Sequence, residues 1–174
     1  MTSDAEIGLE PFDAADHTGL LARWLRAPHV ARWWGNPDRA LAEVLRPPAG
    51  GGHAVIVAGS TAVGYLRWEV PPRQAFAEAG LHEIPDGTLD IEIAIGEPDF
   101  LGRGIGPAAL RRLLGRLLRR GDAPLIMICT SVHNCPAIRA YEKAGFKRVR
   151  QFDDPGYGRM WLLTIEPGKQ PLPG

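Results

Sequence analysis

Two acidic side chains in the middle of the chain are the first candidates for chemistry. The segment 88–95 alternates, with Leu89, Ile91, Ile93 and Ile95 on one face of an expected strand and Asp90, Glu92 and Ala94 on the other. A carboxylate on a central strand is a candidate general base, acting directly or through water. Two acids side by side would also attract a cationic amine. The alternative is that both acids face solvent at a strand that has separated from its neighbour.

A glycine-rich turn follows this strand. Residues 101–107 read Leu-Gly-Arg-Gly-Ile-Gly-Pro and lead into an expected helix that continues to about residue 120. Glycines allow close backbone approach to an anion, and the first turn of a helix offers free N–H groups. Pro107 suits that first turn, and Arg103 adds a positive charge. The turn is not a P-loop and fits a dinucleotide fingerprint poorly, and a plain tight turn remains the alternative.

Aromatic, histidine and cysteine residues add weaker candidates. Trp33 and Trp34 are adjacent and either form an aromatic wall for a sugar or amine, or close the first helices against the core. The five histidines and two cysteines have no metal-ligand spacing, so no metal is expected. A nucleophilic pair of Cys129 and His133 is conceivable, but Cys129 ends an apolar strand, which favours a core position.

Composition narrows the class of protein. The chain has 174 residues, 45% of them hydrophobic, and a formal net charge of zero. We therefore expect one globular, cytoplasmic domain that binds neither nucleic acid nor membrane. Residues 1–100 hold fifteen acids and seven Lys or Arg, whereas residues 101–174 hold five and thirteen. Such asymmetry indicates either two ligands of opposite charge or two solvated faces that neutralise each other.

Periodicity and turn residues predict a mixed α/β sheet. Strands are expected at 6–12, 53–58, 63–70, 88–95, 125–129, 147–152 and 159–165. Helices are expected at 17–27, capped by Asp16, and at 38–45, 106–120 and 135–144. An interruption is expected over 29–37, an acidic binding flap over 71–87, and a disordered tail after residue 167. The core is expected over about residues 6–165, with no second domain.

Three segments in order carry a family resemblance. They are Glu-Ile-Ala-Ile-Gly-Glu-Pro from residue 92, the Gly-Arg-Gly-Ile-Gly turn, and Asn134 followed by Ala-Ile-Arg-Ala-Tyr-Glu-Lys-Ala-Gly-Phe at residues 137–146. Together they resemble the GNAT superfamily of acetyl-CoA-dependent N-acetyltransferases, and most closely its aminoglycoside 6′-N-acetyltransferases. The resemblance covers about residues 6–165. It implies the GNAT fold, a twisted mixed sheet flanked by helices whose two central parallel strands splay apart in a V.

The resemblance also implies sites for acetyl-CoA, which would be a co-substrate. The turn at 102–107 would hold the pyrophosphate, and the backbone of Ala94 and Ile95 would pair with the pantetheine arm. Asn134 would hydrogen-bond pantetheine, and Arg139 and Lys143 could reach the phosphates. The cofactor-binding residues implied are Ala94, Ile95, Gly102, Arg103, Gly104, Ile105, Gly106, Pro107, Asn134, Ala137, Arg139, Tyr141 and Lys143.

The expected reaction moves an acetyl group to a primary amine of a small polycation, most closely the 6′-amine of an aminoglycoside, as in antibiotic resistance. Glu92 is the expected base and Tyr141 the acid that protonates the leaving thiolate. The expected substrate-binding residues are Trp33, Trp34, Asp90, Glu92, Asp153 and Asp154, together with the acidic stretch 78–99. Either a monomer or a homodimer is expected.

One position departs from the aminoglycoside enzymes. Cys129 stands where they typically place an Asp, five residues before the Asn. Two other functions therefore stay open. One is acetylation of a lysine, a siderophore or a protein N-terminal amine. The other is a non-catalytic sensor that binds acyl-CoA.

Overall fold

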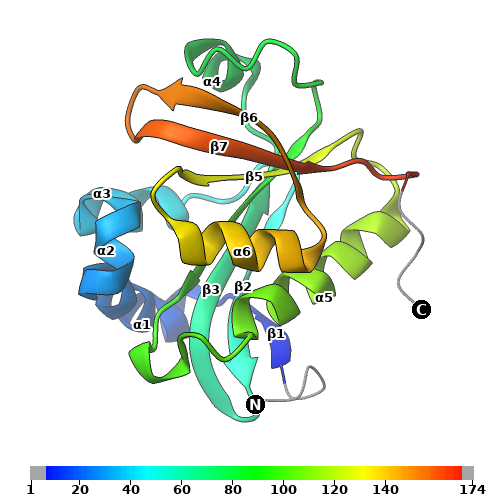
Figure 1. The fold of residues 1–174 in the computed structure, drawn as a ribbon. Helices are drawn as coiled ribbons and strands as arrows, with labels where there is room; N and C mark the ends of the chain where they lie inside the picture. The colour runs from blue at the N-terminus through cyan, green and yellow to red at the C-terminus, as the bar shows by residue number, and fades with distance from the viewer. Residues whose placement is uncertain (1–6, 170–174) are drawn as a thin grey trace.

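Seven strands form one sheet in the computed structural model, which describes residues 7–169 (Figure 1). Their order across the sheet is β1-β2-β3-β4-β5-β7-β6. The strands are β1 (Ile7–Pro11), β2 (Gly52–Ala58), β3 (Thr61–Glu69), β4 (Leu89–Ile95), β5 (Ile126–Ser131), β6 (Lys147–Asp154) and β7 (Gly158–Ile165). Only the β4–β5 pair is parallel within the described residues, so the mixed sheet is confirmed. Residues 170–174 of the expected disordered tail lie outside the described range.

The two central strands separate partway along their length. The β4–β5 ladder runs from Leu89 opposite Ile126 to Ile91 opposite Ile128 and ends there, although both strands continue. Beyond this point the facing edges of β4 and β5 have no ladder partner in each other. The V-shaped splay is thus present, and it opens the sheet at its centre.

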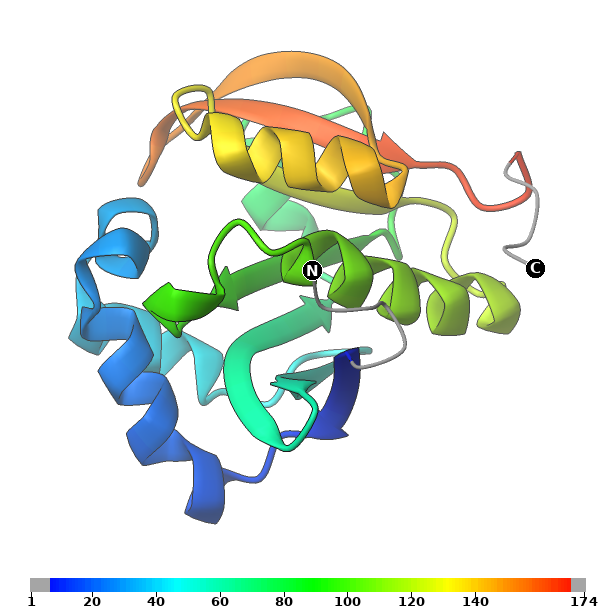
Figure 2. The ribbon, with the colours of Figure 1, turned by 60° about the horizontal axis from the view of Figure 1, so that its bottom comes forward.

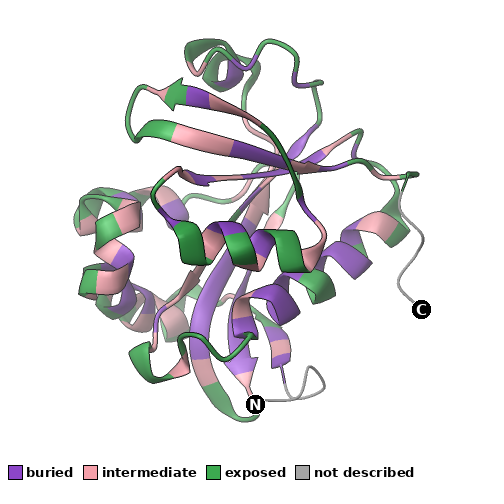
Figure 3. Cartoon of the chain, viewed as in Figure 1, coloured by how far each residue is buried: buried purple, intermediate pink, exposed green. Residues whose placement is uncertain are grey.

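Helices cover both faces of the sheet. They are α1 (Ala14–Arg26), α2 (Pro28–Trp34), α3 (Pro37–Val44), α4 (Arg73–Glu78), the short 3₁₀ turn η2 (Pro98–Phe100), α5 (Ile105–Arg120) and α6 (Cys135–Ala144). The apolar faces of α5 and α6 pack on one side, in the largest core cluster (Figure 3). On the other side, α1–α3 pack on β2 and β3, and α4 packs with β5–β7. No helix within residues 7–169 has the length and apolar character needed to cross a bilayer.

The first helices differ from the sequence-based expectation. Asp13, not Asp16, caps α1: its carboxylate accepts hydrogen bonds from the N–H groups of Ala15 and Asp16. The expected interruption at 29–37 is mostly helical, because Pro28 begins α2 and Gly35, with φ 77°, ends it. As a result the C-terminal end of α2, with Trp33 and Trp34, lies beside the gap between β4 and β5.

The connection between β3 and β4 lines the cavity described below with apolar side chains rather than with its acids. Arg150 of β6 pairs with Glu83 and also donates to the carbonyl of Gly80. Arg73 pairs with Asp86. Neither of these two acids lines the cavity described below, so the expectation that they collect a polycation is wrong. Arg150 thus ties the connection to β6, whereas Arg73 joins two parts of the connection to each other.

Candidate active site

A cavity of about 1160 Å³ fills the gap between the separated ends of β4 and β5. Its walls come from α2, the connection before β4, β4 and β5 themselves, the start of α5, α6 and the β6–β7 hairpin. Figure 2 shows α2 and α3 approaching the same side of the sheet as the tip of the β6–β7 hairpin. The cavity therefore passes through the splayed sheet, from the face covered by α5 and α6 to the face covered by α1–α3, which is called the α3 side below.

The α5 end of the cavity is suited to an anion. Gly104 precedes α5 with φ 78° and supplies no side-chain cap, so the N–H groups of the first turn keep no side-chain acceptor. Gly102 also has positive φ, and a Cβ at Gly102, Gly104 or Gly106 would meet open space. Pro107 occupies the first turn without needing an acceptor. Of the predicted turn residues, Gly102, Gly104, Ile105, Gly106 and Pro107 all line the cavity.

Basic side chains at this end divide into two groups. Arg139 and Lys143, both on α6, line the cavity. Arg103 does not, and its guanidinium instead lies 5.2 Å from the ring centre of Phe100. Cation–π stacking over Phe100, which does line the cavity, thus holds the Arg103 guanidinium.

The edge of β4 offers backbone groups to the gap. Gly96 N–H bonds to Val63 O, and Leu89 N–H bonds to Leu125 O, so the backbone groups of the odd-numbered residues point toward β5. Beyond the ladder these are Ile93 and Ile95. Ala94 lines the cavity, but it is paired with Tyr65 of β3, so the edge expected at Ala94 and Ile95 is presented by Ile93 and Ile95.

His29 of α2 reaches this edge. Its Nε2 lies 2.9 Å from the carbonyl oxygen of Ile95. A carbonyl only accepts, so Nε2 carries the proton. The sequence indicates no function for His29, because the histidines lack metal-ligand spacing. No set of three or more possible metal ligands occurs within residues 7–169.

Tyr141 on α6 is buried at the splay, with 7% of its surface exposed. Its hydroxyl is hydrogen-bonded to Thr130 of β5, whose Oγ1 also accepts from Asn134 Nδ2 at 3.2 Å. Burial is the main cause that raises the pKa of Tyr141 above its ordinary value. The phenol is therefore fully protonated at neutral pH and can act as a proton donor.

Asn134 has a structural role in addition to lining the cavity. Its Oδ1 accepts from the N–H of Ala137 at 3.3 Å and so caps α6, while its Nδ2 holds Thr130. Ala137 lines the cavity beside it. The side chain expected to bind pantetheine thus already has partners at both ends, and its direct effect is to position Thr130 and α6.

Asp90 and Glu92 lie together on the α3 side of the gap. Burial, followed by the negative charge of Glu92, raises the pKa of Asp90 well above its ordinary value. Glu92 is exposed to the solvent that fills the cavity. The cavity walls nevertheless surround its carboxylate closely, and this partial desolvation raises the pKa of Glu92 to about 7. Arg67 acts in the opposite direction on Glu92. A carboxylate that titrates near neutrality is well matched to general-base catalysis.

The outer part of this side has aromatic and acidic walls. Trp33 and Trp34 line it, as does Asp154, whose Oδ1 also accepts from the N–H groups of Gly156 and Tyr157. Asp153 does not line it, because it faces away and pairs with Arg159 at 3.0 Å. The prediction for Asp153 is therefore wrong, since successive strand residues point to opposite faces.

Cys129 lines the cavity and packs against the cluster formed by α4 and β5–β7. Burial, and then the charge of Asp90, raises the pKa of its thiol well above the ordinary value. The thiol is therefore neutral, which excludes the nucleophilic thiolate considered for Cys129 and His133.

Several cavity residues are not singled out by the sequence, among them His29, Thr130 and Tyr157, and neither is Arg67 beside the cavity. For Thr130 the signal was available, because a polar residue follows the apolar strand that contains Ile126 and Ile128. Tyr157 lies in the β6–β7 turn, 51% exposed, and only the folded hairpin brings it to the cavity.

Comparisons with known proteins agree with this geometry. The family model described as "Acetyltransferase (GNAT) domain" matches residues 13–154. Aminoglycoside N(6′)-acetyltransferase type 1 of Klebsiella pneumoniae is 26% identical over an alignment of 145 residues, which covers 74% of this chain and 68% of that protein. A kanamycin resistance protein of Rhizobium radiobacter is 35% identical over 66 residues, which are 38% of this chain and 61% of that protein.

Solved structures share the fold. AAC(6′)-Ib in complex with coenzyme A and kanamycin has a TM-score of 0.77 at 23% identity, over 92% of this chain and 94% of that one. The ribosomal L7/L12 α-N-protein acetyltransferase RimL has a TM-score of 0.68 at 14% identity, over 95% and 96%. The family match spans most of the chain and contains the splayed strands, the glycine turn and α6, and on that ground this protein belongs to the GNAT acetyltransferase family.

Proposed function

We propose that this protein transfers the acetyl group of acetyl-CoA to a primary amine of an aminoglycoside, at the 6′ position. One observation carries the proposal: a single cavity connects an uncapped helix N-terminus to a pair of acids across the gap between β4 and β5. An anionic donor and a cationic acceptor can thus approach the same point from opposite sides.

Acetyl-CoA is the donor in this proposal. Its pyrophosphate would bind the N–H groups at the start of α5, with Arg139 and Lys143 available for further phosphate contacts. The pantetheine amides would bond to the edge of β4 that β5 leaves unpaired at Ile93 and Ile95, in the way an added strand would, sharing the Ile95 carbonyl with His29. This places the thioester at the bottom of the splay, between Tyr141 and Glu92.

The reaction needs an unprotonated amine. Glu92, ionised above its pKa of about 7, accepts a proton from the acceptor ammonium, directly or through a water molecule. The nitrogen lone pair then attacks the thioester carbonyl carbon. When the C–S bond breaks, its electron pair leaves with sulfur, and the Tyr141 hydroxyl donates a proton to the thiolate. The attacking nitrogen gives up its second proton as the amide forms, and that proton restores the Tyr141 phenol.

The acceptor class rests on the walls of the α3 side. Asp90, Glu92 and Asp154 supply carboxylates, and Trp33 and Trp34 supply flat apolar surface of the kind that lies against sugar rings. The relative from Klebsiella pneumoniae carries the same activity in its name. The proposal that the acetylated amine is the 6′-amine rests on the name of that relative.

The test is thiol release from acetyl-CoA with kanamycin, tobramycin, lysine and a basic peptide, each measured separately. We expect turnover with the two aminoglycosides and little with the others, with the 6′-acetylated product identified by NMR. Turnover only with lysine or peptide would keep the acetyltransferase chemistry but reject the acceptor. Acetyl-CoA binding without thiol release for any amine would support a non-catalytic sensor.

A further inference from the structure

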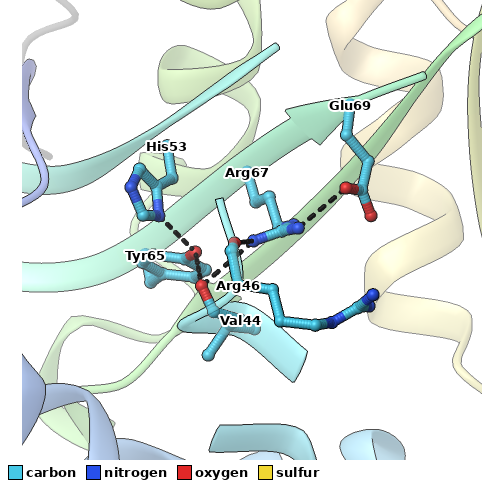
Figure 4. A network of polar contacts seen from close by, with 6 residues as sticks. All are labelled: Val44, Arg46, His53, Tyr65, Arg67 and Glu69. Atoms are coloured by element: carbon cyan, nitrogen blue, oxygen red, sulfur yellow. Dashed lines mark hydrogen bonds and ion pairs between the residues drawn. The ribbon is translucent and has the colours of Figure 1, made fainter. Parts of the chain in front are cut away.

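Arg67 is a buried cation at the centre of a network of hydrogen bonds and one ion pair (Figure 4). Only 2% of its surface is exposed. Its Nη1 donates to the carbonyl of Val44 at 3.0 Å and to that of Arg46 at 2.8 Å, at the C-terminal end of α3. Its Nη2 bonds to Glu69 at 2.7 Å. The guanidinium therefore ties α3 to the sheet and has one carboxylate as a direct partner.

The strand register places this cation beside the proposed base. Arg67 of β3 is directly opposite Glu92 of β4, and Glu69 is directly opposite Asp90. Residues directly opposite in an antiparallel pair project from the same face, with Cβ atoms about 5 Å apart. Three acids and one arginine thus share the face that lines or borders the acceptor side of the cavity.

Charged and titratable groups from several elements surround Glu92, and Arg32 of α2 lines the same cavity. The surrounding groups are Tyr65, Arg67 and Glu69 on β3, Asp90 on β4, Cys129 on β5, Glu43 and Arg46 at the end of α3, Tyr141 on α6, and Asp154 and Tyr157 at the β6–β7 hairpin. Negative groups outnumber positive ones. Arg46 and Arg32 are both exposed, so Arg67 is the buried cation of this set.

We propose that Arg67 is a positioning residue that acts through Glu92, by placing a fixed positive charge beside its carboxylate and by holding Glu69 and the end of α3 in register. The inference rests on the proposed role of Glu92 as the base. It assigns to Arg67 a control over the pH range of the reaction, which is separate from its support of the fold.

Two substitutions in the same ion pair should move the pH profile in opposite directions. Arg67→Met removes the cation and leaves Glu69 unpaired, so the acidic limb of kcat/KM should move up by about one pH unit. Glu69→Gln removes an acid and leaves the cation, so the same limb should move down. Arg67→Lys keeps the charge and should restore most of the wild-type profile. A role limited to folding predicts no such reversal of sign.

Arg26→Met is the matched control. Arg26 pairs with Asp38 at the start of α3, so its loss also loosens α3 but leaves the charges around Glu92 in place. We expect an unchanged limb for this variant. If Arg67→Met folds and keeps the wild-type limb, or if Glu69→Gln fails to lower it, the inference is overturned. Because Glu69 is partly exposed, its variant remains a test even where Arg67→Met does not fold.

A second readout separates this inference from the proposed function. The carboxyl carbon of Glu92 can be followed by NMR in glutamate-labelled protein, with Glu92→Gln identifying its signal. The titration midpoint should rise in Arg67→Met and fall in Glu69→Gln even if no tested amine is acetylated. Absence of turnover with shifted midpoints would reject the function alone, whereas turnover with unshifted midpoints would reject the role of Arg67.

Discussion

His29 and Ile95 connect the acceptor side of the cavity to the open edge of β4. The imidazole Nε2 donates to the Ile95 carbonyl at 2.9 Å, and four residues later in the same helix come Trp33 and then Trp34. This hydrogen bond, together with the core packing of Val30 and Trp34, therefore helps to set the position of both tryptophans relative to β4.

Replacing His29 with alanine should weaken this connection. We expect a loss of about 1 kcal/mol in the free energy of unfolding, the usual contribution of one hydrogen bond. KM for the acceptor should rise more than KM for acetyl-CoA, because the tryptophans belong to the acceptor side. Denaturant unfolding and steady-state kinetics measure the two effects. His82→Ala, at an exposed site, is the control, and equal increases in both KM values would count against this assignment.

Glu92→Gln tests the proposed base. Turnover should fall by about a hundredfold or more, which is typical for loss of general-base catalysis. Binding of acetyl-CoA, measured by calorimetry, should stay within a few-fold, since the proposed anion site is at the start of α5. In the wild type, kcat/KM should rise with pH through about 7 because only ionised Glu92 accepts a proton. A variant that retains both turnover and this rise would remove Glu92 from the mechanism.

Local patterns predicted two parts of the candidate site. The alternation in 88–95 placed Asp90 and Glu92 on one face, and the glycine turn marked the start of α5. Both signals depend on residues close in sequence, where periodicity and turn preferences operate. The family resemblance supplied Tyr141, whose helix motif is itself continuous.

Long-range packing decided what the sequence could not predict. Arg67 reads as an ordinary polar residue of a strand, and its burial depends on carbonyls at Val44 and Arg46, 21 or more residues away. The choice between Asp153 and Asp154 depends on which face of the β6–β7 hairpin meets the cavity. The pairing of Glu83 with Arg150 joins positions 67 residues apart. Such contacts are set by tertiary structure rather than by local pattern.

Asp90→Asn should stabilise the protein at high pH. The pKa of Asp90 is raised in the folded state, so the folded state binds its proton more tightly than the unfolded state does. The free energy of unfolding therefore falls as pH rises above about 4, the pKa of an aspartate in the unfolded chain. Above that pH the unfolded chain loses the proton of Asp90 more readily than the folded protein does. The variant should melt higher than wild type at pH 8, by about 3 °C per kcal/mol relieved, and show no gain at pH 3. An identical gain at both pH values would contradict this electrostatic cause.

Tyr141→Phe tests the proposed acid. Loss of the hydroxyl should lower kcat by about tenfold to a hundredfold, while acetyl-CoA binding changes little. Thr130→Val is the companion variant, since it keeps the phenol but removes its hydrogen-bond partner. Its effect on kcat should be smaller than that of Tyr141→Phe. The reverse order of the two effects would indicate that Thr130, rather than the phenol, contacts the reacting atoms.

Tyr157 should affect the acceptor and not the donor. Its ring lines the cavity from the β6–β7 turn with half of its surface exposed, and its hydroxyl is influenced by Glu43 of α3 across the opening and by Glu92 within it. An exposed aromatic ring at the mouth of an acidic cavity can lie against an apolar sugar face or a bound cation. Tyr157→Ala should therefore raise KM for aminoglycosides about threefold to tenfold, while kcat and KM for acetyl-CoA stay close to wild type.

Tyr157→Phe distinguishes the ring from the hydroxyl. If the ring provides the contact, the phenylalanine variant should keep the wild-type KM, because the stacking surface is unchanged. Val149→Ala is the control for loss of an exposed apolar side chain, since Val149 is 52% exposed and does not line the cavity. The acceptor KM should not change in that variant. A similar rise in Tyr157→Ala and Tyr157→Phe would assign the effect to the hydroxyl, and an unchanged KM in both would place the acceptor away from the hairpin.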